Sequence, residues 1–345
     1  MKKKIQYTTV DFFKLIMAVI VVIMHSNTTH TSSFFNMFNK CIATIAVPFF
    51  FIISGYFFEK GLSNADDKKC YFFKYEKKLL LLYLFWSVVS LPFTVLTYTQ
   101  MYYDKSVFYI IAVILRRYLL CGEGVFWYIL AMAESAIVLY FLDKLKKRWL
   151  LIVAIVLGIM LGCMYESEIL NQIHAVNRIN SIFYYVFSWS NNFIMKGIPF
   201  MGIGCLLTEL DNKSSSNICL VSGLLFFVST CLNVFLFYLN YNSSFLFILE
   251  TISISAFSIH YKTTIAPQKA VLMRELSSSI YFTHTFILYY IIETFLGREL
   301  LIPIKALLTI IICVIIYLIV KLLLKKYNLK WLSTMFNIKR REVFS

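Results

Sequence analysis

The first apolar segment of the chain carries three ionisable side chains, Asp11, Lys14 and His25. At about 100° per residue, the step from Lys14 to His25 returns to within roughly 20° of the same helical face. That step is roughly 16 Å along a helix, so we expect Lys14 to pair with Asp11 instead. Two interpretations fit these three residues. They form either a catalytic line with an acid–base histidine, or a buried ion pair below a histidine that caps the helix.

The composition decides which solvent surrounds these residues. Of 345 residues, 60% are hydrophobic and only 15% are charged, and the mean hydropathy is +0.74. An ordinary soluble domain has about 25% charged residues, and a soluble fold of this length could not bury so much apolar surface. The sequence therefore predicts an all-α, polytopic bundle of transmembrane helices.

Ten apolar runs are long enough to be spans. They lie at about 9–25, 42–58, 79–98, 126–142, 149–164, 194–210, 218–239, 244–259, 279–296 and 302–324. Two weaker segments, 107–120 and 180–190, are short or polar at their ends, so they are predicted to be re-entrant or interfacial. If either one spans, the topology after it inverts. Residues 1–345 are predicted to form one membrane domain.

Lys and Arg residues are concentrated in alternate loops, which predicts the orientation of the chain. Basic clusters at Lys2–Lys4, Lys74–Lys78, Lys144–Arg148 and Lys339–Arg341 fall on one side of the ten-span arrangement. Cytoplasmic loops carry this excess, so both termini are predicted to be cytoplasmic.

The net charge of +15 and the eight cysteines exclude some functions. The basic residues lie in short loops between apolar runs, not on a soluble domain with stacking aromatics, so no nucleic-acid partner is expected. The cysteines occur singly, without CxxC spacing or a neighbouring histidine cluster. No disulfide framework, zinc site or other metal site is therefore predicted.

Five short motifs resemble, in this order along the chain, those of the acyltransferase-3 family of membrane-bound O-acyltransferases. The first is a basic residue followed by a histidine eleven positions later, and the second is a Pro-Phe-Phe-x-x-x-Ser-Gly-Tyr run. The motifs are Lys14 to His25, Pro48 to Tyr56, Phe126 to Leu130, Phe200 to Gly204 and Ser279 to His284. The resemblance covers nearly the full chain. Two features depart from the family. Lys14 stands where the family usually has arginine, and the nearest acids to Trp127 are Glu123 and Glu134.

This resemblance implies a function. Family members transfer an acyl group, commonly acetyl from acetyl-CoA, to a hydroxyl of a sugar or other envelope molecule. The expected enzyme is an O-acetyltransferase in a bacterial plasma membrane, with acyl-CoA as co-substrate and no bound cofactor. Its expected partners are the lipid bilayer, a glycan or other hydroxyl acceptor, and glycan-assembly proteins. His25, at the outer end of the first span, is expected to be the general base, with Asp11 and Lys14 below it.

Five further residues are expected to bind the donor or the acceptor. Arg116 and Arg117 either snorkel to the interface or re-enter the bundle to bind an acceptor or stabilise an oxyanion. Trp127 and Tyr128 lie at the outer end of their span, where such residues are usually anchors. The resemblance makes His284 a donor-site candidate on the cytoplasmic side, although a lone histidine there often joins helices.

Two other functions fit the same sequence. Ten spans, buried charges and helices interrupted by glycine or proline also suit a transporter of a small molecule or glycan intermediate. No internal repeat is visible, which favours the enzyme. The other function is that of a non-catalytic membrane partner in a glycan-assembly complex, in which loss of His25 is harmless.

Overall fold

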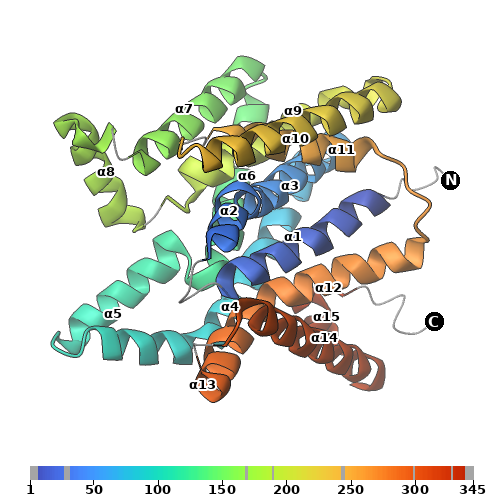
Figure 1. The fold of residues 1–345 in the computed structure, drawn as a ribbon. Coiled ribbons are helices and arrows are strands. Elements are labelled where there is room, and N and C mark those ends of the chain that lie inside the picture. The colour runs from blue at the N-terminus through green and yellow to red at the C-terminus, as the bar shows by residue number, and fades with distance from the viewer. Residues whose placement is uncertain are drawn as a thin grey trace. The chain divides into compact units, whose positions relative to one another are not determined.

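The computed structural model describes residues 7–26, 32–167, 170–188, 190–241, 245–297, 300–327 and 329–338. Every regular element in these ranges is helical (Figure 1), which confirms the all-α prediction. The terminal basic clusters Lys2–Lys4 and Lys339–Arg341, used above to orient the chain, lie outside the described residues.

Eight helical stretches in the described ranges are long and apolar enough to cross a membrane. They are Thr8–Ser26, Ser33–Ser63, Lys68–Met101, Val107–Lys144, Arg148–Glu166, Phe193–Asn212, Ser215–Tyr238 and Ile302–Tyr327. Of the ten predicted spans, 244–259 corresponds to a shorter apolar helix, Leu246–His260. The predicted span 279–296 starts inside the helix Pro267–Phe286, whose first half is polar, and continues beyond its end. The count of ten and the cytoplasmic termini stay predictions.

The chain divides into two compact units. The first unit combines Met1–Phe50 with Glu209–Ser345, and the second is Phe51–Thr208. Helix α3 (Ala46–Ser63) contains the border between them. The prediction of one membrane domain over 1–345 stays a prediction.

In the first unit, α1 (Thr8–Ser26) packs chiefly against α12 (Pro267–Phe286) and also against α14 (Ile302–Tyr327). Helices α10 (Ser215–Tyr238) and α11 (Leu246–His260) form a second close pair. Shorter elements complete the unit: α2 (Ser33–Cys41), the 3-10 turns η1 (Ala43–Ile45) and η6 (Thr208–Asn212), the π-helix η7 (Ile287–Ile292), α13 (Glu293–Leu296) and α15 (Lys330–Met335).

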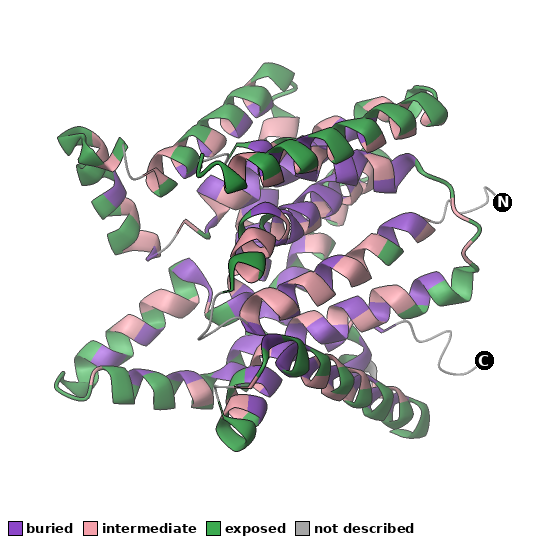
Figure 2. Ribbon diagram, viewed as in Figure 1, coloured by how far each residue is buried: buried purple, intermediate pink, exposed green. Residues whose placement is uncertain are grey.

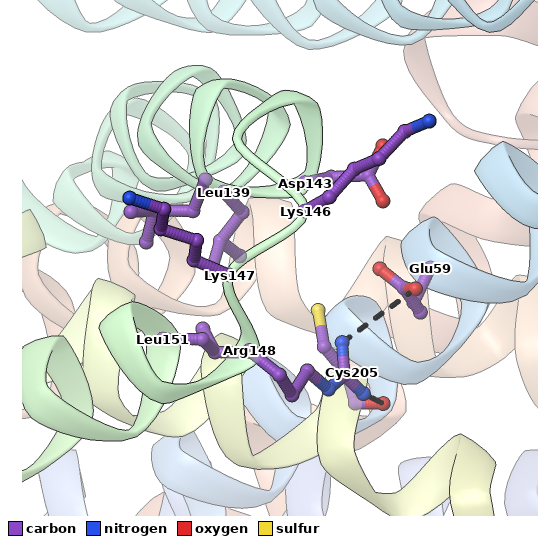
Figure 3. A pocket seen from close by; sticks show the side chains of 9 residues that line it. Glu59, Leu139, Asp143, Lys146, Lys147, Arg148, Leu151 and Cys205 are labelled. Carbon is purple, nitrogen blue, oxygen red and sulfur yellow. Dashed lines mark hydrogen bonds and ion pairs between the residues drawn. The ribbon is translucent and has the colours of Figure 1, made fainter.

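In the second unit, α4 (Lys68–Met101) packs on α6 (Trp127–Lys144), and α7 (Arg148–Glu166) packs on α9 (Ile198–Leu207). The turn between α6 and α7 borders a pocket (Figure 3). The remaining elements are α5 (Val107–Arg116), the π-helices η2 (Arg117–Cys121) and η5 (Phe193–Gly197), the 3-10 turns η3 (Gly124–Phe126) and η4 (Leu170–Gln172), and α8 (His174–Phe187).

Side-chain caps fix where several helices begin. Asp67 precedes α4 and accepts a hydrogen bond from the backbone N–H of Cys70. Ser106 does the same for Tyr109 at the start of α5. Each cap satisfies one of the N–H groups that a helix leaves without an internal partner.

Glycine permits the close approach of α3 and α9. A Cβ atom on Gly55 would collide with the backbone of Met201, and one on Gly204 would collide with the backbone of Ile52. The Sγ atom of Cys205 also donates to the Gly55 carbonyl over 3.6 Å. These contacts explain the Ser-Gly step after Pro48, because small residues let two membrane helices pack backbone to backbone.

Several helices have one exposed face (Figure 2), and many of the exposed residues are large and apolar. On α10 they include Leu220, Leu224 and Phe227, which are 57–66% exposed. An apolar surface of this kind would drive association in water but is the expected surface toward lipid. The exposed faces therefore support the membrane interpretation of the composition.

Candidate active site

Helix α1 places the three ionisable residues on one side of the first unit. Asp11 is buried in the first turn of α1, whereas Lys14 and His25 are partly buried, and His25 lies in the last turn. The apolar residues between them pack against α12 and α14. Helix α1 therefore carries a carboxylate at one end and an imidazole at the other.

The C-terminal end of α1 meets two side chains from the distant end of the chain. The rings of His25 and His284 have centroids 5.3 Å apart and are tilted by 47°. The Nδ1 atom of His25 lies 3.3 Å from the Tyr289 hydroxyl oxygen, across 264 residues of sequence. His25, His284 and Tyr289 are hereafter called the histidine site.

The hydrogen bonds of His284 fix its tautomer. Its Nδ1 atom lies 3.0 Å from the carbonyl oxygen of Ile280 and 2.9 Å from that of Tyr281. Carbonyl oxygens only accept hydrogen bonds, so Nδ1 carries the proton of the neutral ring and Nε2 carries the lone pair. Nε2 is buried and has no hydrogen-bond partner among the described residues, and the whole residue is 0% exposed.

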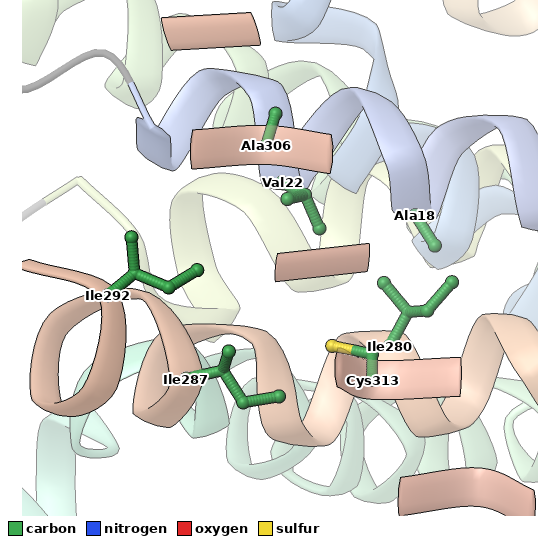
Figure 4. Packing of buried hydrophobic residues seen from close by; sticks show 7 residues of the cluster. All are labelled: Ala18, Val22, Ile280, Ile287, Ile292, Ala306 and Cys313. Carbon is green, nitrogen blue, oxygen red and sulfur yellow. The ribbon is translucent and has the colours of Figure 1, made fainter. Parts of the chain in front are cut away.

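A buried apolar cluster holds the histidine site in place (Figure 4). Ala18 and Val22 of α1 pack there with Ile280, one turn before His284. The other buried members are Ile287, Ile292, Ala306 and Cys313. Thr283 adds a hydrogen bond to Cys313 of α14. Tight packing of this kind restricts the rotamers of the two rings.

The π-helix η7 follows His284 directly and contains Tyr289. A π-helix holds an extra residue in its turn, which rotates the side chains after it relative to a regular helix. Such segments occur often at functional sites. Here η7 is the element that brings the Tyr289 hydroxyl to His25.

The other end of α1 lies beside the polar half of α12. Arg274 approaches Asp11, with Nη1 to Oδ2 at 4.0 Å, and the Ser277 hydroxyl donates to the carbonyl oxygen of Lys14 over 3.0 Å. Asp11 thus has an arginine neighbour that the sequence analysis missed. The predicted pairing of Asp11 with Lys14 stays a prediction.

Helices α1 and α12 run parallel (Figure 1). Asp11 meets Arg274 at the beginning of the pair, and His25 meets His284 at its end. The expectation that His284 lies on the cytoplasmic side while His25 lies at the outer end is therefore wrong. Its cause is the polar first half of α12: the helix begins at Pro267, and His284 lies roughly 26 Å along it.

Two more ion pairs with buried members join α14 to α12 and to α13. The Glu275 carboxylate accepts a hydrogen bond of 2.8 Å from Tyr317 and lies 3.7 Å from the Lys321 ammonium. Lys305 of α14, whose residue is 0% exposed, lies 3.8 Å from Glu293. Buried ion pairs of this kind fix helix register where lipid offers no other partner.

In the second unit, Arg116 and Arg117 have partners from the protein. Arg116 donates to the Tyr185 carbonyl oxygen over 2.7 Å and to the Ser188 hydroxyl over 3.1 Å. The Arg117 Nε atom donates to the Tyr98 hydroxyl over 2.6 Å and lies 3.4 Å from Glu123. The two hydrogen bonds of Arg116 are made to the C-terminal end of α8. A role of either arginine toward an acceptor stays a prediction.

Trp127 and Tyr128 pack inside the second unit beside α3. The Tyr128 and Ser54 hydroxyls are 3.1 Å apart. The Phe51 ring has its centroid 4.5 Å from that of Tyr128 and 5.8 Å from that of Trp127. These contacts join two of the sequence motifs, Phe126 to Leu130 and Pro48 to Tyr56. Ligand binding by either residue stays a prediction.

Comparison with known proteins identifies the chain. A family profile described as "Acyltransferase domain" matches residues 7–320. The chain belongs to the acyltransferase-3 family. The acyltransferase-3 match covers both units and all eight residues predicted for the site. It supports a multi-pass membrane acyltransferase whose partners are the bilayer, an acyl donor and an acceptor.

One similar protein has a name that does not mention acyl transfer. An amino-acid racemase from Enterococcus faecalis is 26% identical over 222 residues, which are 62% of this chain and 30% of that protein. The chain therefore spans less than a third of the length of this curated relative. No solved structure matches the chain.

Sequence reasoning missed Tyr289 and Arg274 as neighbours of the acyltransferase-3 motifs. Arg274 lies in the polar stretch 267–278, which does not look like part of a span and therefore predicts a loop. Tyr289 has no signal of its own in the sequence, since its position depends on the π-helical turn of η7. Groups of His, Cys, Asp or Glu that could hold a metal ion are absent from the described part of the chain.

Proposed function

We propose that this protein moves an acyl group, specifically acetyl, from cytoplasmic acyl-CoA to a hydroxyl of an envelope glycan. The observation that carries the proposal is the histidine site, where two imidazoles lie side by side and the buried Nε2 atom of His284 has no protein partner. A buried polar atom without a partner is costly, and active sites are where such atoms are retained.

The reaction requires two proton transfers, both through His25, and one bond exchange. The acceptor oxygen attacks the thioester carbonyl carbon as His25 takes the hydroxyl proton. A new C–O bond forms, the C–S bond breaks, and the proton returns from His25 to the departing thiolate. The products are an ester and free CoA thiol, so no further reactant is consumed.

The two histidines have different parts in this scheme. His25 is only partly buried, so a substrate can reach it, and it is the proposed base. His284 is fully buried behind it, with its Nδ1–H group committed to the backbone. Its Nε2 atom gives the site a hydrogen-bond acceptor beside the His25 ring. Lys14, nearer the start of α1, would meet anionic or amide groups of the donor.

The membrane and the partners follow from this chemistry. An envelope glycan as acceptor places the enzyme in a bacterial plasma membrane, with glycan-assembly proteins as neighbours. The similarity to a protein of Enterococcus faecalis supports a bacterial setting. The acyl-CoA donor is cytoplasmic, which agrees with an α1 that begins on the cytoplasmic side and ends at His25.

The test uses the purified full chain in lipid nanodiscs, with acetyl-CoA and glycan from cells that lack the gene. His25→Gln should bind acetyl-CoA but lose about 10²- to 10⁴-fold in turnover, because glutamine keeps hydrogen bonding yet cannot take the proton. Released thiol and new ester are measured together. Substantial ester formation by His25→Gln would remove His25 as the base. Uptake of a solute by the chain in sealed liposomes, without thiol release, would indicate a transporter.

A further inference from the structure

The pocket at one end of the second unit is lined by residues of four helices and one turn (Figure 3). The pocket is open, and its empty space of about 480 Å³ includes solvent outside the protein. The lining residues are Glu59, Leu139, Leu142, Asp143, Lys146, Lys147, Arg148, Leu151 and Cys205. The pocket therefore combines three basic side chains with an apolar wall of three leucines.

The acidic residues of the pocket already have cationic partners. Asp143 accepts a hydrogen bond of 2.9 Å from Lys68. Glu59 lies 3.8 Å from the Arg148 guanidinium, which also donates to the Cys205 carbonyl oxygen over 3.2 Å. With Lys68, Lys146, Lys147 and Arg148 against two carboxylates, the pocket has an excess of positive charge. That excess resides on Lys146 and Lys147.

Both of these lysines are exposed, and their ammonium groups have no hydrogen-bond or ion-pair partner in the part of the chain that the structure describes. They lie on the short turn between α6 and α7, where Lys146 has a positive φ of 51°. Figure 3 shows their ammonium groups extending in different directions from this turn. Side chains of this length and freedom can converge on an anion in the pocket.

The backbone at the same place adds to the positive potential. Helix α7 begins at Arg148, and its N-cap residue, Lys147, makes no side-chain capping hydrogen bond. The first N–H groups of a helix point outward without internal partners, and the helix dipole favours an anion there. A phosphate oxygen in the pocket would accept hydrogen bonds that no side chain supplies.

We infer that this pocket binds a phosphate ester that has an apolar group next to the phosphate. Lys146, Lys147 and the start of α7 would hold the phosphate, and Leu139, Leu142 and Leu151 would contact the apolar neighbour. The basic turns at 60–78 and 144–148 place this end in the cytoplasm by the positive-inside rule. Two sources carry the required chemistry: the nucleotide part of acyl-CoA and the head group of an anionic phospholipid.

The experiment gives one probe to each source. The full chain is placed in nanodiscs of phosphatidylcholine and titrated calorimetrically with adenosine 3′,5′-bisphosphate, which has no thioester and cannot react. In parallel, nanodiscs with equal phosphatidylcholine and phosphatidylglycerol are analysed by native mass spectrometry for retained lipid. The variant is Lys146→Asn with Lys147→Gln, since asparagine tolerates a positive φ. The matched control is Lys74→Gln with Lys77→Gln, two exposed lysines outside the pocket.

The variant should bind one of the two probes about tenfold more weakly, while the control binds like the unmodified protein. Loss of nucleotide binding assigns the pocket to the donor, and loss of phosphatidylglycerol assigns it to lipid. Equal binding of both probes by variant and control, or no binding of either probe, would overturn the site. Lys147→Gln alone repeats the comparison if the double variant does not fold.

The nucleotide arm rests on the proposed function, but the two can fail separately. If the variant forms ester with an unchanged KM for acetyl-CoA, the donor assignment of the pocket fails and the proposed function stands. If the unmodified protein binds a phosphate probe but forms no ester, and the variant binds that probe more weakly, the acyltransferase proposal fails and the pocket stands.

Discussion

Arg117 in the second unit and His284 in the first show opposite ways of placing a polar side chain inside a helical membrane protein. Arg117 has the Tyr98 hydroxyl and the Glu123 carboxylate beside it. The Nδ1–H group of His284 donates to a backbone carbonyl of its own helix, and its Nε2 atom is buried without a hydrogen-bond partner in the described residues. A satisfied group stabilises the fold, whereas an unsatisfied one costs about 1–3 kcal/mol unless a ligand completes it. The comparison predicts that Arg117 serves stability and His284 serves chemistry.

The largest expected effect is at His284. His284→Gln should fold, because glutamine is similar in size and keeps a hydrogen-bond acceptor, but turnover should fall about 10- to 10²-fold because the basic Nε2 lone pair beside His25 is lost. Ester formation per mole of folded protein is the measurement.

His260 is the matched control for this variant. Its Nδ1 atom also bonds the carbonyl four residues back, at 3.0 Å, and its Nε2 atom is also buried without a hydrogen-bond partner in the described residues. That Nε2 atom, however, lies 3.6 Å from Asp211 rather than beside His25. His260→Gln should keep most of its turnover. Equal losses in the two variants would mean that buried histidines of this unit act only through folding.

The second effect is on stability, at Arg117. Arg117→Gln removes the cation beside Glu123, whose side chain is only 16% exposed, and should lower the free energy of unfolding by about 3 kcal/mol. Turnover of the molecules that stay folded should change little. Thermal unfolding in nanodiscs measures the first quantity.

The double variant Arg117→Gln with Glu123→Gln sharpens this prediction. It removes the unpaired charge as well and should recover part of the lost stability. If Arg117→Gln instead has the same free energy of unfolding as the unmodified protein and a higher KM for the acceptor, Arg117 belongs to the binding site. The contrast with His284 is then wrong.

The smallest effect is expected at Tyr289, which we treat as a positioning residue for His25. Tyr289→Phe removes one hydrogen bond of 3.3 Å, so kcat should fall about two- to tenfold. The KM for acetyl-CoA should not change. Tyr290→Phe removes the neighbouring hydroxyl from the same π-helix and should leave both constants unchanged. A rise in KM for Tyr289→Phe would show that its hydroxyl contacts substrate.

The sequence was sufficient for the fold class and the family. Charge is scarce enough that only lipid can surround the apolar runs, and the motifs from Lys14 to His284 are short and local. Both the scarcity of charge and these motifs can be recognised without knowledge of the fold. The proposed base, His25, also followed from one helix and its resemblance.

The depth and the partners of His284 could not be predicted. A hydropathy pattern predicts that a span starts after the last charged residue. Because Arg274 and Glu275 are charged, the first half of α12 was not predicted to be part of the helix. The contact of His25 with Tyr289 joins residues 264 apart and depends on the extra residue in a π-helical turn. Nothing local in the sequence signals either feature, because both arise from packing between α1, α12 and α14.

The parallel pairing of α1 and α12 also restricts how the chain between them can be threaded. Two parallel helices side by side enter the bilayer from the same face, so the chain from Ser26 to Pro267 must cross an odd number of times. The predicted spans from 42–58 to 244–259 account for seven crossings. If these seven predicted crossings hold, the parity is preserved only when α5 and α8 both cross or when neither does. A topology in which one of them crosses alone is then inconsistent with the ten-span prediction.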